Sequence, residues 1–252
     1  MAAYRAPSLF QPHRAREALA DTHAGRIPPL IGYFAGLSST AITRVAASFG
    51  YDIIVVDWEH STLNLETMTQ IVHDIQFMSE GRSMAFVRVP GSYHALISYA
   101  MDAGASIIVP QVETVEQAGQ IIAAAKFGRK ASGSRSAPPD ASYLIESLEA
   151  IHNLNVILAE VGDQIGSVWL GSLDARFSMD IALYESTLRK HNKPASGLAF
   201  GSYETNIAMA RGKSFVVAAG DMFGLIETRL RDLAFARENY TKIDHSQVYK
   251  EL

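Results

Sequence analysis

Eight short apolar runs, each followed by a helical stretch, recur along this chain of 252 residues. Each run is apolar on both faces of an extended backbone, as expected of a parallel sheet that is covered by helices. Eight strand–helix alternations in about 250 residues match a (β/α)₈ TIM barrel, an α/β fold. The runs are Leu30–Phe34, Ile53–Asp57, Met84–Val89, Ser106–Pro110, Tyr143–Glu146, Val168–Gly171, Ala195–Phe200 and Phe215–Ala219.

A doubly wound parallel sheet is the alternative fold. It lacks support because Gly212-Lys213-Ser214 has no upstream glycine of the kind a P-loop needs. No linker, repeat or low-complexity tract divides the chain. We therefore predict a single barrel over residues 29–235, preceded by an arm and helix over residues 1–28 and followed by a tail over residues 236–252.

The stretches between the runs predict helices, with Ser39 and Asn64 as caps of the first two. The clearest are Thr40–Phe49, Leu65–Met78, His94–Ala103, Val115–Lys126 and Tyr184–His191. The arginines of residues 1–28 are typical of a transit peptide, but Glu17 and Asp21 interrupt them and an apolar signal core is missing. The cytoplasm is therefore the default location.

Composition excludes several functions. The chain has 22 Lys and Arg against 26 Asp and Glu, a net charge of −4, and no basic patch of the kind that binds nucleic acid. It has no cysteine, which excludes a disulfide scaffold, a zinc ribbon and a thiol nucleophile. No apolar run approaches the roughly 20 residues that span a membrane.

Charged residues directly follow the second apolar run. The β-forming residues 53–56 lead into Asp57, and Glu59 and His60 come next. Asp57 and Glu59 share one strand face, and His60 follows at the strand end. In a TIM barrel the carboxyl ends of the strands carry the chemistry, so these three are candidate catalytic residues. The alternative is that Asp57 caps a helix and the other two form a solvated turn.

Arg88 stands in the apolar sequence 84–90 and must find an anion, because an unpaired buried charge is very costly. An internal salt bridge with Asp57 or Glu59 and a fork for a substrate carboxylate are equally consistent with its position.

Two neighbouring strands end in carboxylates. Glu146 closes the run that starts at Tyr143, and Asp174 follows the next run after Gly171. Adjacent strands lie about 4.8 Å apart, so the two carboxylates can share one hard divalent cation. The alternative is that Glu146 and Asp174 are helix caps or solvent-exposed carboxylates without a metal.

Together these motifs resemble the HpcH/HpaI aldolase family, whose members are metal-dependent class II pyruvate aldolases with a phosphoenolpyruvate/pyruvate-binding type of TIM barrel. Within the family the resemblance is nearest to the fungal branch that includes macrophomate synthase, over residues 80–83 and 112–116. The resemblance spans about residues 30–225 and is carried in order by residues 57–60, 87–90, 101–105, 107–110, 133–136, 145–147 and 170–174.

The resemblance implies a role for each candidate. Glu146 and Asp174 match the ligands of a divalent cation, Mg²⁺ or else Mn²⁺ or Co²⁺. Arg88 matches the arginine that holds pyruvate or its enolate, and His60 matches the acid–base histidine.

The other matches complete this implied site. Asp57 and Glu59 match acids around the metal-bound waters. Asp102 matches an aspartate that reaches a neighbouring subunit's site, which implies a homo-oligomer, a trimer or hexamer. Residues Gly171, Ser172 and Leu173 match the turn that binds the substrate carboxylate.

The sequence also departs from the family. Phe34 stands at a substrate-binding position where many relatives have tryptophan, Leu144 where glutamine is common, and Ser172 where proline is usual. The connections at residues 136–143 and 178–184 are shorter than the active-site loops of relatives.

The resemblance implies a lyase that makes or breaks carbon–carbon bonds to a pyruvate enolate, acting on 4-hydroxy-2-oxo acids. An oxaloacetate decarboxylase, or a carbon–carbon bond-forming enzyme like macrophomate synthase, would use the same enolate. A CoA-thioester lyase would need a basic groove that the sequence does not indicate. A non-catalytic relative that binds a small acid is disfavoured because the candidate residues are all present.

Overall fold

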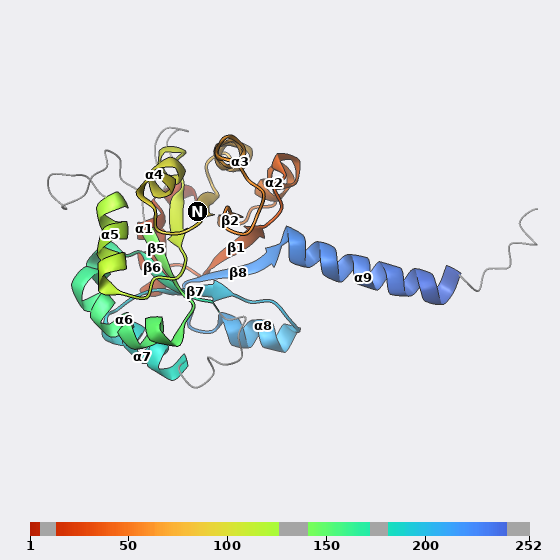
Figure 1. The fold of residues 1–252 in the computed structure, drawn as a ribbon. Coiled ribbons are helices and arrows are strands. Elements are labelled where there is room, and N and C mark those ends of the chain that lie inside the picture. Colours follow the sequence, from red (N-terminus) through yellow and green to blue (C-terminus); the bar gives the residue numbers. More distant parts are fainter. Residues whose placement is uncertain (6–13, 126–140, 172–180, 241–252) are drawn as a thin grey trace, which may run out of the picture.

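A closed barrel of eight parallel strands forms the centre of the computed structural model, which describes residues 1–5, 14–125, 141–171 and 181–240 (Figure 1). The strands pair in chain order, and β8 closes the barrel against β1. This confirms the predicted (β/α)₈ barrel. The strands are β1 Leu30–Ala35, β2 Ile53–Asp57, β3 Met84–Arg88, β4 Ser106–Val109, β5 Ala141–Ile145, β6 Ser167–Leu170, β7 Ala195–Leu198 and β8 Phe215–Gly220.

Helices surround the barrel, and two predicted caps are present. The Ser39 side chain accepts a hydrogen bond from the backbone N–H of Ile42, and Asn64 accepts one from Thr67, so α2 and α3 begin as predicted. The helices are α1 Ala15–His23, α2 Thr40–Ala47, α3 Leu65–Met78, α4 His94–Asp102, α5 Val115–Ala125, α6 Leu148–Val161, α7 Ile181–Lys190, α8 Tyr203–Ala210 and α9 Asp221–Asn239, with short 3₁₀ turns η1 Ala2–Tyr4 and η2 Gly162–Gln164.

The alternation of side chains along each strand divides the core into two layers. In β2, Ile53 and Val55 belong to the cluster inside the barrel, whereas Ile54 and Val56 belong to the cluster between the strands and the helices. Both layers are buried, which explains why the run is apolar on both faces. Leu19 of α1 joins the inner cluster and closes the end of the barrel at which the strands begin.

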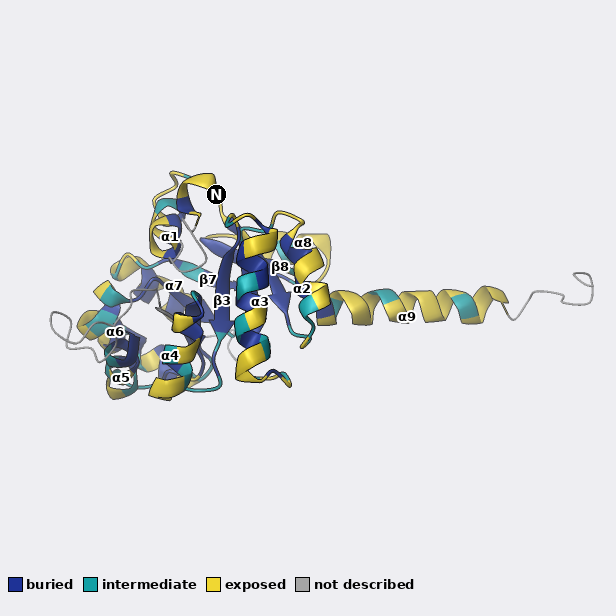
Figure 2. Ribbon diagram, turned by 90° about the horizontal axis from the view of Figure 1, so that it is seen from above, coloured by how far each residue is buried: buried dark blue, intermediate teal, exposed yellow. Residues whose placement is uncertain are grey.

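The last helix, α9, projects away from the barrel and does not lie against the wall (Figures 1 and 2). It is fixed at its first residue, because the Asp221 carboxylate accepts hydrogen bonds from the backbone N–H groups of Gly36 and Leu37 at 2.8 and 3.1 Å. Beyond Asp221, no described residue of α9 is buried. The helix crosses residue 235, where we placed the end of the barrel, and the division of the chain stays a prediction. None of the described helices combines the length and hydropathy of a membrane span.

Candidate active site

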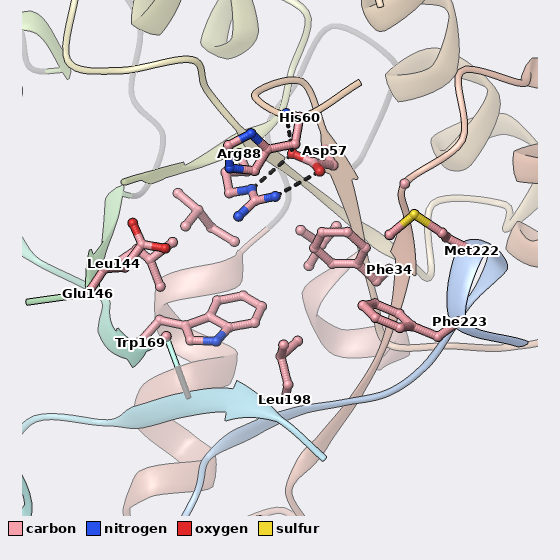
Figure 3. Close-up of a pocket in the computed structure, with 14 residues that line it drawn as sticks. Phe34, Asp57, His60, Arg88, Leu144, Glu146, Trp169, Leu198, Met222 and Phe223 are labelled. Carbon is pink, nitrogen blue, oxygen red and sulfur yellow. Dashed lines mark hydrogen bonds and ion pairs between the residues drawn. The ribbon is translucent and has the colours of Figure 1, made fainter. Parts of the chain in front are cut away.

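A cavity of about 550 Å³ opens at the carboxyl ends of the strands (Figure 3). Its lining comes from β1 to β7, from the residues that follow β1, β2, β5 and β6, and from the start of α9. The lining residues are Phe34, Gly36, Val55, Asp57, His60, Arg88, Ile108, Leu144, Glu146, Trp169, Gly171, Leu198, Met222 and Phe223. The barrel topology therefore brings together six of the predicted site residues: Phe34, Asp57, His60, Arg88, Glu146 and Gly171.

Arg88 and Asp57 form a two-pronged ion pair at one side of the cavity. They are the last residues of β3 and β2 and stand opposite each other in the register of the two strands. Arg88 Nε lies 2.9 Å from Asp57 Oδ1, and Nη2 lies 2.7 Å from Oδ2. None of the described contacts uses Nη1, so this end of the guanidinium can still donate into the cavity. Arg88 thus forms an internal salt bridge and keeps a face for an anion.

Electrostatics keep Arg88 charged. Burial alone would lower the pKa of Arg88, but the hydrogen bonds and charge of Asp57 and the charge of Glu59 raise it above its ordinary value. The guanidinium carbon also lies 5.5 Å from the centre of the Phe34 ring, in the range of a cation–π contact. A fixed positive charge therefore faces the cavity.

Glu59 lies between Arg88 and His60. Its Oε2 atom is 3.4 Å from Arg88 Nε and 3.5 Å from His60 Nε2, yet it accepts no hydrogen bond within the described residues. Burial raises the pKa of Glu59, and the charges of Arg88 and His60 only partly oppose this. The His60 side chain is 68% exposed and stands at the mouth.

Asp57 also shapes this turn, because its Oδ1 atom accepts from the backbone N–H groups of Glu59 and His60, each at 3.2 Å. The alternative that Asp57 caps a helix is wrong, because α3 begins at Leu65 and is capped by Asn64. Asp57 instead holds the turn after β2, beside its ion pair with Arg88.

Glu146 faces the cavity from the end of β5. No hydrogen bond or ion pair joins its carboxylate to another described residue, and Figure 3 draws none. Gly171, at the end of β6, leaves the space in which Glu146 lies: a Cβ atom there would be 2.9 Å from Glu146 Cγ. The neighbouring strand ends therefore place a carboxylate with open coordination positions inside the cavity.

Five predicted site residues are not among the cavity lining. Glu59 lies beside the lining, within ion-pair distance of Arg88 and His60. Ser172, Leu173 and Asp174 lie outside the described residues. Asp102 is exposed at the end of α4. Because the helices of the barrel run opposite to the strands, this is the end away from the cavity mouth.

The sequence reasoning missed most of the apolar lining. Val55 and Trp169 stand two residues before Asp57 and Gly171, so the period of two in a strand could have placed them on the same face. Leu144, which the resemblance had singled out, stands in the same relation to Glu146. Met222 and Phe223 had no comparable signal. They line the cavity only because α9 starts against β1 and β8.

Comparisons with known proteins identify the family of the chain and agree with its fold. Residues 30–222 match the family model described as HpcH/HpaI aldolase/citrate lyase. The 2-keto-3-deoxy-L-rhamnonate aldolase of Klebsiella pneumoniae subsp. pneumoniae is 27% identical, over 83% of this chain and 89% of that protein. The crystal structure of macrophomate synthase superimposes with a TM-score of 0.85 at 25% identity, over 96% of this chain and 95% of that one. The citrate synthase SbnG shares the fold, with a TM-score of 0.76 at 20% identity over 89% of this chain and 100% of that one.

Proposed function

The chain belongs to the HpcH/HpaI aldolase/citrate lyase family, and on that premise we propose that it is a divalent-metal-dependent carbon–carbon lyase that stabilises a pyruvate enolate. Its substrates are 4-hydroxy-2-oxo acids, which are cleaved to pyruvate and an aldehyde or formed from them. The observation that carries the proposal is the convergence of the Arg88–Asp57 pair and the Glu146 carboxylate on one cavity at the strand ends.

The carboxylates fit a hard divalent cation. Glu146 faces the cavity with no described partner, and Asp174 follows the adjacent strand end by a few residues. Oxygen ligands favour Mg²⁺ or Mn²⁺. In the described residues, no three His, Asp or Glu side chains form a ready cluster, so substrate and water oxygens would complete the ligand set. When bound, such a cation would polarise the carbonyl of a 2-oxo acid.

Arg88 supplies fixed positive charge for the enolate oxygen. The charge of an enolate develops on the former carbonyl oxygen, and a donor held in place beforehand stabilises it without reorganisation. Asp57 provides that rigidity because it holds Nε and Nη2 of Arg88 and leaves Nη1 toward the cavity.

His60 moves the proton of the substrate hydroxyl group. It stands at the mouth, with Nε2 3.5 Å from Glu59 Oε2, so a proton on the ring has a carboxylate partner nearby. An imidazole ring can both accept and donate a proton through its nitrogen atoms, which suits removal and return of the hydroxyl proton.

We also propose that the active unit is a homo-oligomer in which α9 packs on a second copy. Several large apolar side chains of α9 are exposed: Leu225, Ile226, Leu230, Leu233 and Phe235. Other elements expose apolar side chains too, among them Val45 of α2 and Ile207 of α8. Large apolar side chains exposed along one projecting helix are typical of an interface. In such an assembly, Asp102 would pair with His60 of a neighbouring subunit.

Light scattering coupled to size exclusion tests the assembly. Leu230→Asp with Leu233→Asp should reduce the particle mass to that of one chain, whereas Val156→Asp, at a half-exposed position on α6, should not. A wild-type protein of one-chain mass would contradict this part of the proposal.

An activity screen tests the lyase itself. Pyruvate release from 4-hydroxy-2-oxo acids, and carbon dioxide release from oxaloacetate, should both require a divalent cation and should stop after EDTA treatment. Both reactions pass through the same enolate, so the ratio of their rates decides between an aldolase and a decarboxylase. Full activity after exhaustive removal of metal would refute the proposal.

A further inference from the structure

The cavity is divided into a charged side and an apolar side (Figure 3). Asp57, Arg88, His60 and Glu146 occupy the charged side and suffice for a 2-oxo acid group. The apolar side is lined by Phe34, Leu144, Trp169, Leu198, Met222 and Phe223, of which Leu144 lies beside Glu146 and Phe34 lies against Arg88 (Figure 3). Among these six side chains, the indole N–H of Trp169 is the one strong hydrogen-bonding group, beside the weak acceptor sulfur of Met222.

Packing contacts between aromatic rings hold the side chains of the apolar side in place. The ring centres of Phe34 and Phe223 lie 6.3 Å apart, and Phe223 packs on Phe200 at 4.6 Å. Trp169 is held edge-on by Phe215 at 5.2 Å. Offset and edge-on contacts of this kind are favourable, so the wall is a preformed apolar surface.

The volume exceeds the needs of pyruvate alone. A cavity of about 550 Å³ falls within the range of roughly 300–1,000 Å³ that holds drug-sized ligands, and pyruvate has only six non-hydrogen atoms. Apart from the charged groups, most of the side chains that line the cavity are apolar, so the second fragment of the substrate would contact mainly apolar side chains.

We infer that the fragment joined to pyruvate is apolar, an aryl or alkyl aldehyde, and not a polyhydroxylated one. This inference rests on the proposed function and names its substrate class. A hydroxyl group placed against the apolar side would lose its water and find almost no described partner, whereas an aryl or alkyl group would gain burial.

The reaction balances without any further reactant. A base removes the proton of the C4 hydroxyl group, the C3–C4 bond breaks, and its electron pair forms the pyruvate enolate while C4 becomes the aldehyde carbonyl. A proton returned to C3 then gives pyruvate. The charged side serves the C1–C3 fragment, and the apolar side receives the group attached to C4.

Paired substrates test the inference. The purified enzyme with Mg²⁺ is given 4-hydroxy-2-oxo-4-phenylbutanoate or 4,5,6-trihydroxy-2-oxohexanoate, and pyruvate release is followed. We expect kcat/KM to be at least about tenfold higher for the phenyl substrate, because each hydroxyl group that is buried without a hydrogen-bond partner weakens binding substantially. A separate arm follows hydrogen–deuterium exchange at the methyl group of pyruvate, which reports the enolate without any aldehyde.

Variants of the apolar side sharpen the test. Leu198→Asn and Met222→Gln each add an amide, and each should reduce the phenyl-to-trihydroxy ratio by about threefold or more. Met222 is partly exposed, so its variant keeps the test decisive if Leu198→Asn fails to fold. Val156→Gln, on the outer surface of α6, should leave the ratio unchanged.

The outcomes separate the two proposals. Exchange at pyruvate together with an equal or higher kcat/KM for the trihydroxy substrate would overturn this inference and leave the lyase intact. Absence of both exchange and cleavage would overturn the proposed function and this inference with it.

Discussion

Replacing Gly171 with alanine would place a methyl group against the candidate metal ligand Glu146. The added Cβ would lie 2.9 Å from Glu146 Cγ, 3.4 Å from its Oε1 atom and 3.5 Å from the backbone oxygen of Ile145. Gly171 does not have a positive φ, so alanine can adopt its backbone conformation. The strain therefore falls on the side chain of Glu146.

The size of the effect follows from that contact. The distance of 2.9 Å is about half an ångström short of the 3.4 Å at which ordinary contact begins, so Glu146 must rotate away. Misplacing a catalytic group by about 1 Å can cost on the order of 100-fold in rate. We expect Gly171→Ala to reduce kcat/KM by about 10- to 100-fold and to raise the Mg²⁺ concentration needed for half-maximal activity.

Steady-state kinetics over a range of Mg²⁺ concentrations measure both effects, and Gly119→Ala is the matched control. Gly119 lies within α5, with no atom within 4 Å of its added Cβ. Its variant should keep wild-type kinetics and gain about 0.5–1 kcal/mol of unfolding free energy. Wild-type kinetics and metal dependence in Gly171→Ala would refute the placement of Glu146 as a ligand.

Three further predictions concern charged groups. Arg88→Lys should lower kcat by about 100-fold or more because lysine cannot make the two-pronged contact, whereas Arg44→Lys, at an ion pair on the helices, should leave kcat unchanged. Burial raises the pKa of Glu59 in the folded state, so the stability that its proton contributes is lost as the pH rises through that pKa. Denaturant titrations should therefore show Glu59→Gln gaining stability relative to wild type as the pH rises above the ordinary pKa of a glutamate. His60→Ala and Asp102→Ala should each be nearly inactive, yet a refolded mixture should regain some activity; no recovery in verified mixed oligomers would place both residues within one chain.

The fold could be predicted because the apolar strand runs and the helix caps, which are local signals, agree with the strand order of a TIM barrel. Runs such as residues 53–57 are buried on both faces, and caps such as Ser39 and Asn64 mark where helices begin. Strand order in a TIM barrel follows chain order, so the pairing of Asp57 with Arg88 could be expected from topology.

The course of α9 could not be read from the sequence. Its first residue is fixed by the N–H groups of Gly36 and Leu37, which lie 185 and 184 residues earlier in the chain, and no local pattern encodes this contact. The placement of Met222 and Phe223 in the cavity depends on the same contact. The apolar character of one half of the site was therefore hidden, while its charged half was visible at the strand ends.

Hydrogen–deuterium exchange at the methyl group of pyruvate tests the central claim most directly, because it reports enolate formation alone. Proton NMR in D₂O with Mg²⁺ should show loss of the methyl signal with the wild-type enzyme. Exchange should slow by about 100-fold or more in Arg88→Lys and in Glu146→Gln, the two residues assigned to the enolate and the cation. Exchange at the wild-type rate in both variants, or no wild-type exchange with any divalent cation, would contradict the account.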